Sequence, residues 1–135
     1  MSKILYIEDE EDNRIITSHR LIMAGHQVLL AEDTVEGIAK ARADAPDLIL
    51  MDLKIKDDET AGLEATRQLK ADPKLRRIPV IAVTAFTEAE KRTESLRAGC
   101  DDHVVRPIDF PQLLKRIETL VTASRSALNQ TSPFS

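Results

Sequence analysis

The chain has 135 residues, a net charge of −4 and a single cysteine, Cys100. This excess of acidic side chains gives no electrostatic case for binding nucleic acid, whose phosphates attract a basic surface. One cysteine excludes an internal disulfide and a cysteine-rich zinc site, and no apolar run is long enough to span a membrane. We therefore expect one compact domain in the reducing cytoplasm, with neither nucleic-acid nor membrane partners.

The first apolar run, residues 3–7, predicts a strand that ends in the consecutive carboxylates of residues 8–12. A helix capped by Asp12 and Asn13 should follow and should end at Gly25. Apolar residues recur in this helix at three-to-four spacing, which is typical of an amphipathic helix. The stripe consists of Ile15, Ile16, His19, Ile22 and Met23.

Four more strand-and-helix units are predicted downstream. The expected strands are 27–31, 48–52, 79–83 and 103–105. The expected helices are 35–43 after a cap at Asp33 or Thr34, 62–71, 88–98 and 109–124. Strands that alternate with helices in this way predict an α/β fold, in which a doubly wound, five-stranded parallel sheet carries helices on both faces.

The run Leu48–Met51 has no polar interruption and suits a central strand covered on both faces, so Asp52 should emerge at its carboxyl end. The carboxyl ends of parallel strands meet at one edge of a sheet. The other residues expected at that edge are Glu8, Asp9, Thr84 and Arg106.

Three carboxylates, a hydroxyl and a cation at one edge indicate phosphoryl chemistry. Glu8, Asp9 and Asp52 offer the hard oxygen ligands that Mg²⁺ prefers, and this ion often joins carboxylates to a phosphoryl group. Asp52 could then attack phosphorus, as carboxylates do when they form aspartyl-phosphates. The hydroxyl of Thr84 and the cation of Arg106 would hold the new oxygens.

Ordered motifs across residues 3–121 resemble those of a response-regulator receiver domain, and especially of the single-domain regulators of the DivK type. The motifs are Ile-Glu-Asp-Glu at 7–10, Leu-Ile-Leu-Met-Asp at 48–52, Ile-Pro-Val-Ile-Ala-Val-Thr-Ala at 78–85, Arg-Ala-Gly-Cys-Asp-Asp at 97–102 and Pro-Ile-Asp at 107–109. The resemblance implies the CheY-like receiver fold, which has flavodoxin-like (βα)5 topology.

The resemblance also implies roles for particular residues. Asp52 would be the phosphoacceptor, Glu8 and Asp9 the acidic pair of a Mg²⁺ site completed by the backbone carbonyl of Lys54, and Thr84 the switch hydroxyl. A histidine kinase or a histidine phosphotransfer protein would supply the phosphoryl group. The protein would be a phosphoacceptor, with at most self-phosphorylation and slow dephosphorylation, and not a dedicated enzyme.

The output implied by the resemblance is a contact with a downstream protein. That contact would use the face formed by helix 88–98, strand 103–105 and helix 109–124, and a homodimer is left open. The receiver domain should span residues 1–123, and residues 124–135 should form a frayed C-terminal tail. His19 and His26 are interpreted as surface or partly buried residues, and Cys100 as a small core residue.

Three departures from the family pattern stand near the predicted site. Arg106 replaces the usual lysine, and its planar fork places charge differently from an ammonium. His103 stands at the aromatic switch position, where it could weaken the switch or make it pH-sensitive. The loop 54–61 has Lys56 in place of a proline and is longer, more acidic and expected to be mobile. The alternative function is therefore a pseudo-receiver that binds partners without phosphorylation.

Overall fold

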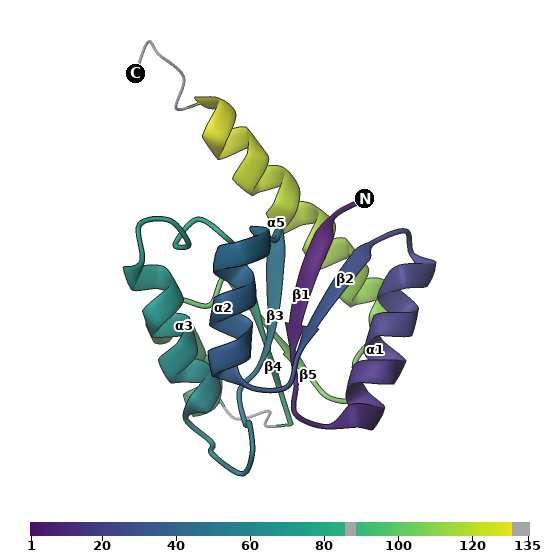
Figure 1. Cartoon of the computed structure of the whole chain (residues 1–135), viewed down its shortest axis with the longest axis vertical. Helices are drawn as coiled ribbons and strands as arrows, with labels where there is room; N and C mark the ends of the chain where they lie inside the picture. The colour runs from purple at the N-terminus through teal and green to yellow at the C-terminus, as the bar shows by residue number, and fades with distance from the viewer. Residues whose placement is uncertain (86–88, 131–135) are drawn as a thin grey trace.

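The computed structural model describes residues 1–85 and 89–130, without the side chains of 89–92 and 128–130. Strands and helices alternate through the described residues (Figure 1). The strands are β1 (Lys3–Ile7), β2 (Gln27–Ala31), β3 (Leu48–Asp52), β4 (Val80–Thr84) and β5 (Asp102–Val105). The helices are α1 (Glu11–Met23), α2 (Thr34–Asp44), α3 (Ala61–Ala71), α4 (Ala89–Ala98) and α5 (Phe110–Gln130). The predicted start of the fourth helix, at 88, lies outside the described residues.

The five strands form one parallel sheet in the order β2-β1-β3-β4-β5. This confirms the predicted α/β fold. The central strand is β3, in which every residue from Leu48 to Asp52 is buried, as its uninterrupted apolar run predicted. Polar side chains that follow β1, β3 and β4 therefore emerge at the middle of one sheet edge.

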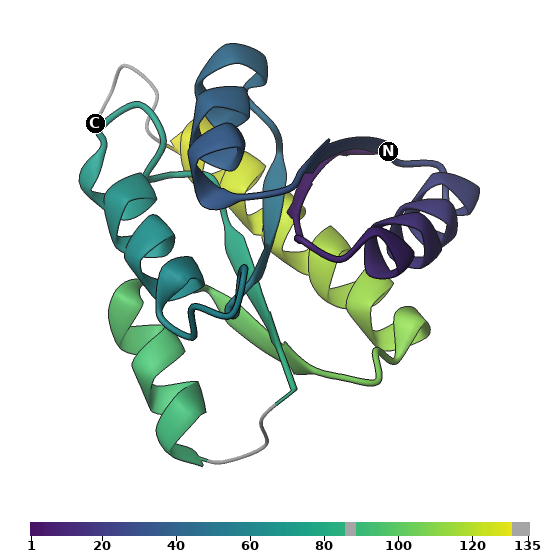
Figure 2. The same cartoon turned by 60° about the horizontal axis from the view of Figure 1, so that its bottom comes forward.

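Helices cover both faces of the sheet (Figure 2). Each face has its own apolar cluster. On one face, residues of α2, α3 and α4 pack against β1 and β3; Cys100 lies in this cluster, in agreement with its interpretation as a core residue. On the other face, residues of α1 and α5 pack against Ile4, Tyr6 and Leu50. Side chains alternate along a strand, so Leu5 and Ile7 point to the first cluster and Ile4 and Tyr6 to the second.

The amphipathic pattern predicted the wrong buried face for α1. Ile15, Ile16 and Ile22 are more than half exposed, and the buried residues are Thr17 and Leu21. Arg14 accounts for this rotation, because its guanidinium donates to the backbone carbonyl of Glu8 at 2.8 Å and to Glu32 at 3.1 Å. Arg14, Thr17 and Leu21 therefore share the inward face, at three- and four-residue spacing.

Helix boundaries also differ from the prediction. The cap expected at Asp12 and Asn13 is wrong, because α1 begins at Glu11 and its N-cap is Glu10, which makes no side-chain cap. Acidic residues in this first turn interact favourably with the helix dipole. The cap at Asp33 is confirmed: its carboxylate accepts a hydrogen bond from the backbone N–H of Glu36 at 2.8 Å.

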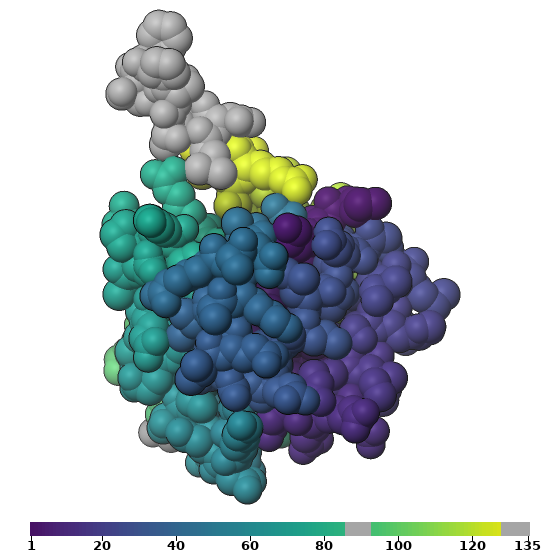
Figure 3. Space-filling model, in the orientation of Figure 1, coloured from purple at the N-terminus to yellow at the C-terminus, as the bar shows by residue number. Residues whose placement is uncertain are grey.

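Helix α5 runs to Gln130, six residues beyond the predicted end near 124. Its last described turns extend past the body of the domain, as Figure 3 shows in space-filling form. Near the point where it leaves the body, Ser124 donates to the carbonyl of Arg77 at 3.4 Å, and Arg125 lies 3.7 Å from Asp47. The flexibility of residues 124–135 stays a prediction. Among the described helices, none is long and apolar enough to cross a membrane.

Candidate functional site

The register of the sheet brings the predicted site residues together at the carboxyl edge. Ile7 of β1 pairs with Met51 of β3, so the next residues, Glu8 and Asp52, stand level with each other. One carboxylate oxygen from each of Glu8, Asp9 and Asp52 lies within 4.8 Å of the others. The sequence therefore located this acidic cluster correctly.

A pocket of about 300 Å³ opens above the cluster. Asp9 and Asp52 line it, together with Lys54, Thr84 and Arg106. Thr84 ends β4 and is buried, and the backbone N–H of Arg106 donates to the carbonyl of Thr84 at 2.8 Å. The hydroxyl-bearing residue and the cation thus stand on the wall of the same pocket as Asp52.

Asp52 is nearly buried, since only 13% of its side chain is exposed. Burial, followed by the neighbouring carboxylate of Glu8, raises the pKa of Asp52 to about 8. Arg106 and the backbone N–H of Lys54, which donates to Asp52 at 3.4 Å, act in the opposite direction without balancing the rise. The surroundings of Asp52 therefore disfavour its ionised form.

Glu8 is fully buried and is compensated by two neighbours. Its Oε1 accepts a hydrogen bond from the Arg106 guanidinium at 2.6 Å and from the Tyr6 hydroxyl at 3.2 Å. Arg106 is farther from Asp52, at 3.9 Å. Burial raises the pKa of Tyr6 to about 12, so its hydroxyl keeps its proton and remains a donor. Arg106 is thus paired with Glu8 in preference to Asp52.

The loop between β3 and α3 is tied to the acidic turn. The backbone N–H of Lys56 donates to the carboxylate of Asp9 at 2.9 Å, and its ammonium lies 3.4 Å from Asp33. Lys56 and Asp57 both have positive φ angles, and Ile55 and Asp58 bond to each other across them, which forms a tight turn. The added length of the loop is thus taken up by a hydrogen-bonded turn. Its mobility stays a prediction.

Gly62, at the start of α3, supports Asp52 from behind. A Cβ atom at this position would lie 2.5 Å from the carbonyl oxygen of Asp52 and 2.6 Å from the Cα of Leu53. Only glycine lets the helix approach the strand this closely. The backbone N–H of Gly62 donates to the carbonyl of Leu53 at 3.0 Å, which fixes the end of β3.

His103 lies on β5, away from the acidic cluster. Its backbone N–H donates to Asp102 at 2.7 Å, and its carbonyl accepts from Arg116 at 3.2 Å. The side chain is half-buried and borders a cavity of about 310 Å³ beside Gln112. The predicted switch roles of Thr84 and His103, and the metal contact of the Lys54 carbonyl, stay predictions.

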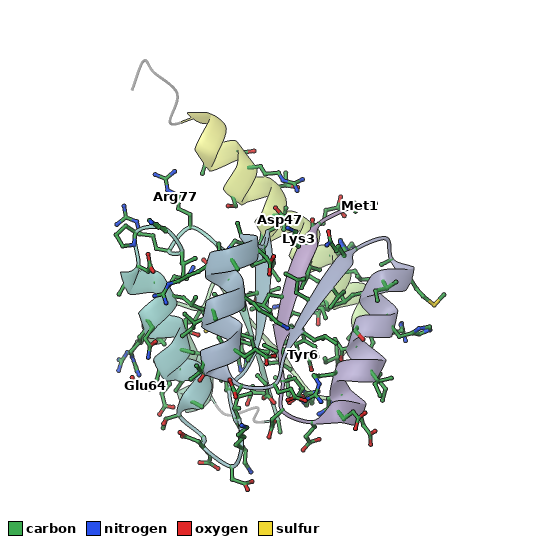
Figure 4. The ribbon with its side chains drawn as sticks, in the orientation of Figure 1. Met1, Lys3, Tyr6, Asp47, Glu64 and Arg77 are labelled. Carbon is green, nitrogen blue, oxygen red and sulfur yellow. The ribbon has the colours of Figure 1, made fainter. Side chains whose placement is uncertain are left out.

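Sequence reasoning missed Tyr6. The sequence pattern places it in a strand and predicts no role at the site, although it stands two residues before Glu8 and therefore points to the same side of the chain. That spacing could have identified it as a neighbour of the acidic cluster. In Figure 4, Tyr6 lies toward the carboxyl end of β1, opposite to the end of the sheet where Lys3 and Asp47 are found.

Comparisons with known proteins agree with this geometry. The family model of the response regulator receiver domain matches residues 4–118. The polar-differentiation response regulator DivK of Brucella anthropi is 34% identical over 116 residues, which are 86% of this chain and 93% of that protein. DivK of Brucella ovis is equally similar over the same shares of both chains.

Solved receiver structures share the fold. The receiver domain of the sensor histidine kinase PA1611 from Pseudomonas aeruginosa, described with a magnesium ion in its active-site cleft, is 29% identical with a TM-score of 0.81 and covers 90% of this chain and 98% of that one. The chemotaxis protein CheY4 of Vibrio cholerae is 28% identical with a TM-score of 0.81, and the match covers 89% and 98% of the two chains. The chain therefore belongs to the response regulator receiver domain family and has the CheY-like fold that its sequence predicted.

Proposed function

We propose that this protein is a cytoplasmic response regulator of a two-component phosphorelay that accepts a phosphoryl group on Asp52. A histidine kinase or a histidine phosphotransfer protein donates the group, and the phosphorylated form signals by contact with another protein. The observation that carries this proposal is the setting of Asp52, which is nearly buried beside Glu8 and Asp9 in a pocket that Thr84 and Arg106 also line.

The acidic cluster fits a divalent cation. Glu8, Asp9 and Asp52 offer three hard oxygens within 4.8 Å of one another, and burial together with Glu8 raises the pKa of Asp52, so a cation here would favour its ionised form. These side chains, with the backbone carbonyl of Lys54, would hold Mg²⁺. The bound ion would supply positive charge for the carboxylates and for the incoming phosphoryl oxygens. The magnesium ion in the related PA1611 receiver supports this assignment.

Added Mg²⁺ should raise the thermal unfolding midpoint, because an ion that binds only the folded protein stabilises it by mass action. Differential scanning fluorimetry with and without Mg²⁺ measures the shift. Asp9→Asn should reduce the shift strongly, because it removes one ligand charge. A control, Asp44→Asn, changes an exposed carboxylate at the end of α2, beside Lys3 at the amino end of β1, and should respond like the wild type. Equal shifts in wild type and Asp9→Asn would show that the ion binds elsewhere.

Asp52, Thr84 and Arg106 each have a role in the transfer of the phosphoryl group from the donor histidine. A carboxylate oxygen of Asp52 forms the new bond to phosphorus while the bond from phosphorus to the donor histidine nitrogen breaks. The electron pair of the broken bond stays with the imidazole, which takes a proton from solvent. The hydroxyl of Thr84 donates a hydrogen bond to one phosphoryl oxygen. Arg106 moves from Glu8 and forms an ion pair with a second phosphoryl oxygen. Its guanidinium starts only 3.9 Å from Asp52, so the movement required is small.

The exposed apolar stripe of α1 is the surface that we assign to the phosphoryl donor. This helix begins directly after Glu10, which lines the pocket, so a protein that reaches Asp52 would also cover α1. Ile15 and Ile22 are more than half exposed, and Met23 is 73% exposed. Several large apolar side chains exposed on one helix favour a protein contact there.

The output surface is the face formed by α4, β5 and α5, where His103 borders its cavity. Addition of Mg²⁺ and beryllofluoride, a phosphoryl mimic, should change the amide chemical shifts around Asp52 and also along β5. Asp52→Asn should give neither change. Shift changes confined to the pocket would contradict the assignment of the output surface while leaving the phosphoacceptor intact.

The alternative is a pseudo-receiver, and the pairing of Arg106 with Glu8 at 2.6 Å favours it, since a strong ion pair keeps the cation from Asp52. A pseudo-receiver would show neither phosphorylation nor a response to beryllofluoride. The ordered set of Glu8, Asp9, Asp52 and Thr84 supports the phosphoacceptor as the first proposal.

A further inference from the structure

The hydroxyl of Tyr6 lies at the centre of a buried charge pair. It donates to Oε1 of Glu8 at 3.2 Å and accepts a hydrogen bond from Nη2 of Arg106 at 3.2 Å. The same Nη2 donates to the same Oε1 at 2.6 Å, so the three groups form a closed triangle. Tyr6 is fully buried, and it is also the only tyrosine in a chain without tryptophan.

The guanidinium of Arg106 lies between two carboxylates, Glu8 and Asp52, and makes hydrogen bonds on the Glu8 side only. Toward Glu8, Nη2 makes two hydrogen bonds, one to the carboxylate and one to Tyr6. Toward Asp52, the same nitrogen is 3.9 Å from the nearest oxygen, beyond hydrogen-bond length. The Tyr6 hydroxyl therefore accepts a hydrogen bond from Arg106 in only one of the two positions that the guanidinium can take.

We propose that Tyr6 is a positioning residue of the receiver site, whose hydroxyl holds Arg106 on Glu8 until a phosphoryl group on Asp52 draws the guanidinium away. The inference rests on the proposed phosphorylation of Asp52. It gives the arginine of this chain a defined resting position, in which one nitrogen, Nη2, donates to both the Tyr6 hydroxyl and the Glu8 carboxylate.

The hydroxyl of Tyr6 stabilises the resting position of Arg106, so its removal should favour binding of a phosphoryl mimic. Tyr6→Phe keeps the ring and removes only the hydroxyl, so it weakens the resting position of Arg106 and leaves the phosphoryl-bound position untouched. The variant should bind beryllofluoride, at saturating Mg²⁺, about five- to tenfold more tightly than the wild type. Amide chemical shifts measure the apparent dissociation constant for both proteins.

The matched control is Ile4→Val. Ile4 is fully buried on the same face of β1 and in the same apolar cluster as Tyr6, but at the opposite end of the strand from the site. This substitution loosens the core without touching a polar group and should leave the beryllofluoride affinity within about twofold of the wild type. In an Arg106→Ala background, Tyr6→Phe should also change the affinity by less than about twofold, because the guanidinium that the hydroxyl holds is gone.

The wild type provides a readout that needs no variant. All intrinsic tyrosine emission comes from Tyr6, so departure of Arg106 should change its intensity on addition of beryllofluoride and Mg²⁺. Asp52→Asn should show no such change. The positioning role is overturned if the wild type binds beryllofluoride but Tyr6→Phe binds it equally or more weakly, or if the Tyr6 emission stays constant. If the wild type gives no amide response at all, the proposed phosphoacceptor function fails, and this inference fails with it.

Discussion

Arg106→Ala should lower the free energy of unfolding by about 3 kcal/mol at neutral pH in the absence of Mg²⁺, because it leaves a buried carboxylate without its cation. Glu8 has no exposed side-chain surface, and its ion pair with Arg106 is 2.6 Å long. The remaining contact, from the uncharged Tyr6 hydroxyl, cannot neutralise it. Urea unfolding followed by circular dichroism measures the loss.

Two companion variants test the cause of this loss. Arg106→Lys keeps the charge and should lower the free energy of unfolding by about 1 kcal/mol or less, because an ammonium can still reach Glu8 but lacks the planar guanidinium. Adding Glu8→Gln to Arg106→Ala should recover most of the stability, since the unpaired buried charge at position 8 is then removed. If Arg106→Ala unfolds at the wild-type urea concentration, Glu8 does not depend on this pair.

Asp52→Asn should have the opposite effect and stabilise the metal-free protein. Burial and Glu8 raise the pKa of Asp52 to about 8 in the folded state, whereas an unfolded aspartate titrates near pH 4. Below about pH 4 the side chain is neutral in both states, so it contributes no difference. As the pH rises toward 8, the unfolded state ionises first and the wild type loses stability.

The stability gap between Asp52→Asn and the wild type should therefore open between about pH 4 and pH 8 and reach about 2–4 kcal/mol. Chemical unfolding at several pH values measures it. Mg²⁺ should narrow the gap, because the ion stabilises the ionised cluster of the wild type. Asp44→Asn, at an exposed carboxylate at the end of α2, should show no such gap. A gap of constant size at all pH values would assign the effect to packing instead of charge.

The fold and the position of the site could be predicted because both follow from local patterns. The apolar run at Leu48–Met51 required a strand covered on both faces, and the alternation of strands with helices required a parallel sheet. Because β1 and β3 are parallel, Glu8 and Asp52 emerge at the same edge of the sheet, independently of the loop conformations.

The features that the sequence did not predict depend on contacts between distant residues. The rotation of α1 is set by Arg14, whose partners include Glu32 on another unit, and no periodicity within the helix encodes that contact. The turn at Lys56 is held by Asp9, 47 residues earlier in the chain. The hydrogen bond between Tyr6 and Arg106 likewise joins residues 100 positions apart, which only the folded sheet brings together.

Intact-mass measurement after incubation with Mg²⁺ and a small phosphodonor, or with a cognate kinase, tests the central claim most directly. The wild type should gain one phosphoryl group, which persists in acid and is lost in base, as expected of an aspartyl phosphate. Asp52→Asn should gain none, while Asp57→Asn should be modified like the wild type. A wild type that remains unmodified would favour the pseudo-receiver, and a phosphorylated Asp52→Asn variant would contradict the assignment of the phosphoacceptor.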